Sequence, residues 1–99
     1  MYQFNIYVAY NHDDFHLFAD ADILAHEHFP DGWTRLHTTG GWHGLTEPGF
    51  VYQMLLDSHS DRPWSVMVFA NSLCILFNQQ AVLVTRQPIE SYLITELIQ

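Results

Sequence analysis

The segment Tyr-Gln-Phe-Asn-Ile-Tyr-Val-Ala-Tyr, residues 2–10, decides the fold class of this chain. Its apolar residues fall on every second position, so one side of an extended chain is apolar from Tyr2 to Tyr10. This alternation, with aromatic and β-branched residues, is typical of a β-strand that covers a core with one face. The sequence thus predicts an N-terminal strand whose second side carries Gln3, Asn5 and Tyr7.

The rest of the chain divides into further predicted elements by apolar periodicity and turn residues. They are a helix over 11–28, a strand over 33–39, a turn at 40–41, a loop over 42–49, a strand over 50–56, a helix over 62–77 and a strand over 81–85. Asn11 is the expected N-cap of the first helix, and Pro30-Asp31-Gly32 is the expected turn after it. Residues 89–98 fit either a short strand or a closing helix.

The predicted order of elements is strand–helix–strand–strand–helix–strand, which is the split βαβ, ferredoxin-like arrangement. We expect an α+β fold in which an antiparallel sheet carries both helices on one face, with a possible extra strand or helix at the C-terminus. The 99 residues are enough for a single domain spanning 1–99. Tyr7, Val51 and Leu55 would make the opposite face of the sheet apolar, and either a partner subunit or the C-terminal segment could cover it. We predict a homodimer built on sheet contacts.

The charge of the chain excludes several classes of partner. Eleven acidic residues face only three basic ones, none of them lysine, and the formal net charge is −8. Binding to nucleic-acid phosphates or to an anionic membrane needs clustered basic residues, so we expect neither partner. Asp13, Asp20 and Glu27 recur every seven residues on one predicted helix face, which makes them candidates for binding a basic protein. A solvated helix face is the alternative.

Neither a membrane span nor a signal peptide is predicted. The apolar runs are far shorter than the roughly 20 residues of a membrane helix, and the first residues lack a basic and an apolar region. We therefore expect a cytoplasmic protein. Cys74 is the single cysteine and lies in an apolar run, so an inert buried thiol is expected.

Seven histidines are an unusual number for a chain of this length, and two of them have the spacing of metal ligands. His12 and His16 would share one helix face, where Asp13 or Asp20 could add an oxygen ligand. Surface histidines without a ligand are the alternative, because the chain has no HExxH or paired Cys motif.

The segment 33–44 is the candidate site for a small ligand. Its tryptophans could stack on a planar group, its arginine could pair with an anion, and the Gly40-Gly41 backbone could approach a ligand closely. A nucleotide or a small aromatic metabolite would fit such a lining. The candidate residues are Trp33, Arg35, His37, Trp42 and His43. The alternative is a tight hairpin whose aromatic residues belong to the core or to a dimer interface.

No catalytic residue and no cofactor can be assigned from the sequence. The run 58–61 contains serine, histidine and aspartate, but catalytic triads are assembled in space and adjacency does not indicate one. A histidine acting with Asp22 or Asp31 as acid and base stays open.

Two short blocks resemble a family of small, functionally uncharacterised bacterial and phage proteins. The first is Phe-Pro-Asp-Gly-Trp-Thr at 29–34, followed by Gly41-Trp42, and the second is Phe-Asn-Gln-Gln-Ala-Val-Leu-Val-Thr at 77–85. The resemblance implies a ferredoxin-like fold and brings no catalytic residues with it.

These observations favour a binding protein over an enzyme. We expect a dimeric, acidic accessory factor of phage or bacterial origin that engages a host protein. Two alternatives stay open: a small-ligand sensor or sequestering protein that uses the 33–43 segment, and a small metal-binding protein or enzyme that uses the histidines.

Overall fold

A computed structural model describes residues 1–57, 63–90, 92 and 94 of the chain, without the side chains of His12 and Trp42. Its elements are β1 (Tyr2–Ala9), the 3-10 helix η1 (His12–Leu17), α1 (Phe18–His28), β2 (Thr34–Trp42), β3 (Leu45–Leu56), α2 (Trp64–Leu76) and β4 (Leu83–Pro88). The predicted order of strands and helices is confirmed.

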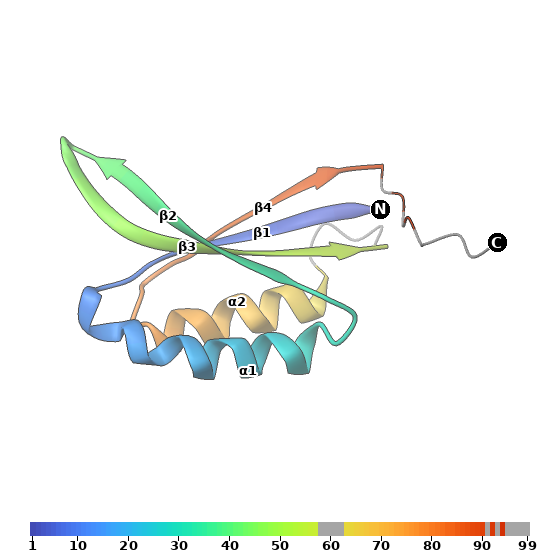
Figure 1. Ribbon diagram of the computed structural model, residues 1–99, viewed down its shortest axis with the longest axis horizontal. Helices are drawn as coiled ribbons and strands as arrows, with labels where there is room; N and C mark the ends of the chain where they lie inside the picture. Colours follow the sequence, from blue (N-terminus) through green and yellow to red (C-terminus); the bar gives the residue numbers. More distant parts are fainter. Residues whose placement is uncertain (58–62, 91, 93, 95–99) are drawn as a thin grey trace.

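The strands form one antiparallel sheet in the order β2-β3-β1-β4. Figure 1 shows α1 and α2 side by side on one face of this sheet, and no described helix lies on the other face, which we call the open face. This is the ferredoxin-like α+β arrangement that the sequence predicts. The two central strands are β3 and β1, and β2 and β4 are the edges.

The core lies between the sheet and the two helices. The alternating residues Phe4, Ile6 and Val8 of β1 are buried on this side, as the strand pattern predicts. Phe50, Tyr52, Met54, Phe18, Ala21, Ala25, Phe29, Val66, Phe69, Ala70, Leu73 and Phe77 complete the core. Many of the ring pairs meet edge to face, an arrangement that adds to the burial of aromatic area.

The open face of the sheet carries an apolar row that runs across all four strands. Leu36 pairs with Val51, Val51 with Tyr7, and Tyr7 with Leu83. Val51 is only 4% exposed although no helix covers it, because its neighbours in the row flank it, whereas Leu36, Tyr7 and Leu83 are at least 42% exposed. The apolar character predicted for this face is thus present.

The β2–β3 hairpin differs from the prediction. The Gly40-Gly41 pair lies inside β2, and the expected loop over 42–49 is a continuous hairpin that turns at His43 and Gly44. Both turn residues have positive φ, 49° and 76°, the geometry that two-residue hairpins favour. Figure 1 shows the hairpin extending beyond the other strands. The prediction was wrong because a Gly-Gly pair was taken as the turn.

Several element ends also differ from the prediction. Asn11 makes no side-chain cap, and the first six residues of the predicted helix form η1, which leaves Phe15 63% exposed. Pro63 precedes α2 instead of lying in its first turn, and β4 begins two residues later than expected.

Cys74 is half-buried, not fully buried as expected. The described residues from 89 onward belong to no strand or helix, and the rest of the 89–98 prediction falls outside the described residues, as does the run 58–61. Within the described residues, neither helix has the length and apolar character needed to cross a bilayer.

Gly49 is a position where the sheet requires glycine. A Cβ atom there would lie 2.8 Å from Thr38 Oγ1 and 3.0 Å from the Val8 carbonyl oxygen, whereas nothing lies within 4 Å of a Cβ at Gly41. We expect Gly49→Ala to lower the free energy of unfolding by about 1–3 kcal/mol, the usual cost of overpacking. The matched Gly41→Ala should change it by less than about 0.5 kcal/mol. Urea unfolding measures both, and equal midpoints for the two variants would contradict this account.

Candidate functional site

The structure divides the five predicted ligand-binding residues into two groups. Trp33, Arg35 and His37 lie at the start of β2, beside α1, whereas Trp42 and His43 lie at the tip of the hairpin. At about 3.3 Å per residue along a strand, the two tryptophan backbones are roughly 30 Å apart. Within one chain they do not form a single site.

Arg35 is held by α1. Its Nε and Nη2 atoms donate to the two carboxylate oxygens of Asp22 at 3.0 and 3.1 Å, and its guanidinium lies 4.6 Å from the centre of the Phe18 ring. The remaining Nη1 faces His37 Nε2 at 3.3 Å. A guanidinium already occupied in this way is a poor receptor for a ligand anion, so the predicted anion contact receives no support.

Tyr52, which lies opposite Arg35 on β3, is the third member of this cluster. Its side chain is fully buried, and its hydroxyl donates to Asp22 Oδ1 at 2.6 Å. Burial raises the pKa of this hydroxyl far above its usual range, and the hydrogen bond to Asp22 and the charge of Asp22 raise it further. Tyr52 therefore stays protonated at neutral pH and does not act as a base. The sequence signal for this cluster was an acidic residue on the apolar face of the first helix.

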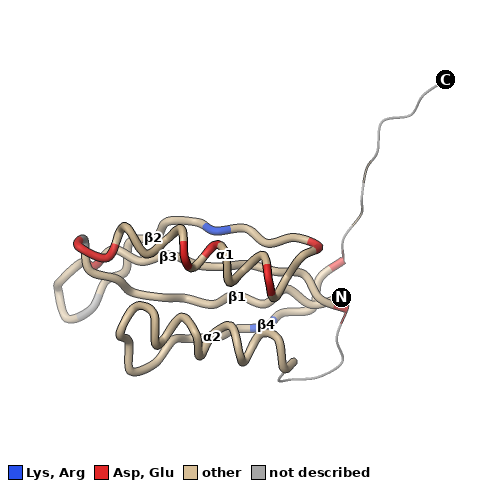
Figure 2. Tube along the Cα trace, turned by 90° about the horizontal axis from the view of Figure 1, so that it is seen from below, with Lys and Arg blue, Asp and Glu red and all other residues tan. Residues whose placement is uncertain are grey.

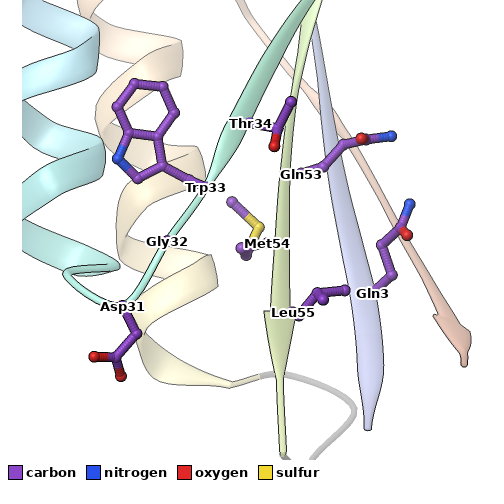
Figure 3. Close-up of a pocket in the computed structure, with 8 residues that line it drawn as sticks. All are labelled: Gln3, Asp31, Gly32, Trp33, Thr34, Gln53, Met54 and Leu55. Carbon is purple, nitrogen blue, oxygen red and sulfur yellow. The ribbon is translucent and has the colours of Figure 1, made fainter. Parts of the chain in front are cut away.

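The Trp33 side chain makes its contacts with residues of the same chain, in α1 and β3. Its indole Nε1 donates to His26 Nδ1 at 3.4 Å, and its ring lies 5.6 Å from that of Tyr52. Figure 3 shows the indole pointing toward α1, away from Thr34 and Gln53. His37 likewise sets its ring edge against Phe18 at 5.4 Å. For Trp33 and His37, these contacts favour the alternative in which the aromatic residues pack against the core over the one in which they stack on a ligand.

The predicted metal pair receives no support from the geometry. His16 Nδ1 lies 2.9 Å from the Asp13 carbonyl oxygen of its own helix turn, and the side chain of His12 is outside the description. In the part of the chain that the structure describes, no three side chains of His, Cys, Asp or Glu come together as metal ligands do.

The predicted acidic surface is exposed. Asp13 lies in η1, Asp20 and Glu27 lie in α1, and all three face solvent. Figure 2 shows acidic positions along α1 and the segment that leads into it, while α2 carries no charged position. Binding of a basic protein to this surface stays a prediction.

Two cavities open on the face of the sheet opposite the helices, and Trp33 is a predicted ligand residue that lines one of them. The larger, which we name the Gln53 cavity, measures about 450 Å³ and is lined by Gln3, Asp31, Gly32, Trp33, Thr34, Gln53, Met54 and Leu55. It lies where the α1–β2 loop meets the ends of β1 and β3 (Figure 3). The smaller, the Glu47 cavity, measures about 280 Å³ and is lined by Tyr7, Val8, Ala9, Thr38, Gly40, Glu47, Pro48, Gly49, Phe50, Gln79 and Ala81.

The two cavities share one electrostatic property. Each is lined by one acidic residue, Asp31 in the larger and Glu47 in the smaller, and no described Lys, Arg or His lines either. Such a site disfavours phosphates and other anions and suits a neutral or cationic ligand. A volume of several hundred Å³ is in the usual range of small-molecule sites.

Comparisons with known proteins show the fold of the chain. It is similar to a phage SAM lyase in its apo state, with 18% identity, 87% of this chain and 78% of that chain covered, and a TM-score of 0.58. A phage SAM lyase in complex with S-methyl-5'-thioadenosine gives 19% identity, coverage of 87% and 79%, and a TM-score of 0.56. A DUF3240 family protein from Shewanella baltica OS155 gives 13% identity, coverage of 96% and 97%, and a TM-score of 0.55.

No family model matches the chain, and no curated protein matches it. The resemblance of residues 29–34 and 77–85 to small bacterial and phage proteins therefore stays an expectation. At these identities, the solved structures support the ferredoxin-like fold and leave the activity to be argued from the site.

The dependence of the free energy of unfolding on pH in the alkaline range tests the Tyr52–Asp22 contact. Because folding keeps the Tyr52 hydroxyl protonated while the unfolded side chain ionises near pH 10, the free energy of unfolding should fall as the pH rises above about 10. Tyr52→Phe should cost about 1.5–3 kcal/mol at pH 7, the value of a hydrogen bond to a charged group, and should remove part of the alkaline loss. Chemical unfolding from pH 7 to 11 measures both. An unchanged alkaline slope in the variant would refute the assignment.

Proposed function

We propose that this protein binds S-adenosylmethionine and cleaves it to release S-methyl-5'-thioadenosine. The observation that carries the proposal is the charge of the cavities, each of which is lined by one acidic residue and by no described basic group. A sulfonium is a cation, so it suits this lining, whereas a nucleotide phosphate does not. The likeness to phage SAM lyases, one of them bound to S-methyl-5'-thioadenosine, supports the choice among cationic ligands.

The reaction requires no nucleophile from the protein. In the cleavage we propose, the substrate's own carboxylate attacks the carbon beside the sulfur and forms a C–O bond. The C–S bond breaks, its electron pair stays on the sulfur, and the sulfonium leaves as the neutral thioether. Both products come from one molecule, so the protein's task is to fold the substrate into a conformation close to reaction. No cofactor or proton donor is needed.

The proposal places the ligand in the Gln53 cavity, with Asp31 facing the positive charge. This cavity is the larger of the two, and it combines the apolar side chain of Leu55 with the amides of Gln3 and Gln53. An apolar lining with a few polar groups is the usual composition of a small-molecule site. An enzyme of this kind thus takes precedence over the purely binding protein expected from sequence, and it is compatible with a phage accessory factor that acts on a host metabolite.

Purified protein incubated with S-adenosylmethionine should release S-methyl-5'-thioadenosine. Liquid chromatography of the reaction mixture measures this release. Because the sulfonium charge disappears as the C–S bond breaks, Asp31 would stabilise the bound substrate more than the transition state. Asp31→Asn should therefore raise KM and kcat together, each by up to roughly fivefold, and change kcat/KM little. Binding of the neutral S-methyl-5'-thioadenosine should be unchanged in this variant.

Glu47→Gln is the matched control, since it removes the carboxylate of the other cavity. The same rise in Glu47→Gln with wild-type kinetics in Asp31→Asn would move the substrate to the Glu47 cavity. No release of S-methyl-5'-thioadenosine by the wild-type protein, at any substrate concentration tested, would refute the proposed activity.

We also propose that the open face of the sheet joins copies of the chain into a homodimer. Leu36, Tyr7 and Leu83 are exposed in one continuous apolar row, and isolated monomers rarely expose such a row. A copy seated there would also restrict access of water to both cavities.

Light scattering should therefore report a dimer at micromolar concentration. Leu36→Asp, which places a charge at the β2 end of the row, should shift the population to monomer, because an unpaired charge at an interface is costly. Ile23→Asp, a matched change at an exposed apolar position of α1, should leave the dimer intact. A monomeric wild-type protein would refute this assembly.

A further inference from the structure

A polar row lies beside the apolar row on the open face. Thr34 pairs with Gln53, Gln53 with Asn5, and Asn5 with Thr85, so each of the four strands contributes one residue. Gln3 belongs to the next row, diagonal to Gln53. Four neighbouring amide and hydroxyl side chains beside an apolar row call for an account of their hydrogen bonds.

Three members of this group satisfy one another. Gln3 Nε2 donates to Asn5 Oδ1 at 2.9 Å, and Asn5 Nδ2 donates to Thr85 Oγ1 at 3.3 Å. Asn5 is only 5% exposed, so its two contacts replace the water that it has lost. The Gln3 side chain is thereby held in place at the wall of the Gln53 cavity.

Gln53 is different, because its side-chain amide has no hydrogen-bond partner among the described residues. Among the residues that the structure describes, no side chain or carbonyl accepts from or donates to it, although the residue is half-buried. Figure 3 shows Gln53 and Gln3 on the same side of the sheet, with Leu55 next to them. A partly desolvated amide that lines a cavity gains from a ligand that supplies a hydrogen-bond donor and an acceptor together.

We propose that Gln53 is the residue that recognises the adenine base in the proposed substrate. Its carbonyl oxygen accepts from the exocyclic amino group, and its amide N–H donates to the adjacent ring nitrogen, a pairing that glutamine makes with adenine elsewhere. Leu55 supplies an apolar wall for the ring, and Gln3, held by Asn5, borders the base. This inference rests on the proposed function, and it names the part of the ligand that the Gln53 cavity selects.

A thermodynamic cycle between the side chain and the base tests the contact. The ligands are S-methyl-5'-thioadenosine and the analogue whose purine lacks the exocyclic amino group, with Kd measured by calorimetry. Gln53→Met removes the amide at nearly constant volume, and Gln87→Met is the matched control, an exposed amide on the same face outside the cavity. Loss of the amino group should weaken binding about tenfold in the wild-type protein and in Gln87→Met, but less than about twofold in Gln53→Met.

A second variant distinguishes loss of the hydrogen bond from general damage to the cavity. Gln53→Glu keeps the acceptor and loses the donor, so it should still distinguish the two ligands through the amino group. Thermal melts of all variants check that each is folded. If the amino group matters equally in wild-type protein and Gln53→Met, the recognition by Gln53 is refuted while the proposed function stands. If the wild-type protein binds neither ligand nor S-adenosylmethionine, the proposed function itself fails, and this inference with it.

Discussion

The carboxylate of Asp22 is the polar contact that fixes α1 to the sheet. It accepts hydrogen bonds from Tyr52 at 2.6 Å and from two guanidinium nitrogens of Arg35, and these two residues lie opposite each other on β3 and β2. A quarter of the Asp22 side chain is exposed, so solvent screens the charge pair itself. The constraint comes from the bidentate geometry and from the buried Tyr52 hydroxyl, which would otherwise lack a partner.

This arrangement has an electrostatic consequence for the opposite face of the sheet. Arg35 points toward α1, and Arg86, the other arginine that the structure describes, lies over the Tyr2 ring on β1. Neither lines a cavity, so Asp31 and Glu47 determine the charge there. From the sequence, the scarcity of basic residues argues only against nucleic acids and membranes as partners. In the structure it also means that the two cavities favour a neutral or cationic ligand.

The sequence was sufficient for the fold because the fold depends on local periodicity. The alternation around Phe4 and Ile6 and the two apolar helical segments lead directly to the ferredoxin-like order. The hairpin turn was missed because its positive φ angles fall on His43 and Gly44, next to a glycine pair that looked like the turn. The cavities could not be predicted for another reason, because their walls come from segments that are far apart in the sequence. The polar positions of a strand pattern do not show which side chains come together in space or which lack a hydrogen-bond partner.

The register of β2 against β3 links these features to one another. The two-residue turn at His43 and Gly44 and the pairing of Arg35 with Tyr52 set the same register from opposite ends of the hairpin. A slip of one residue would reverse every side chain of β2, since successive residues of a strand point to opposite faces. Arg35 would then face the open side and lose Asp22, while Leu36 would leave the apolar row and Thr34 the Gln53 cavity. The contact that fixes α1 to the sheet and the surface that holds the cavities are therefore specified together, and neither can change alone.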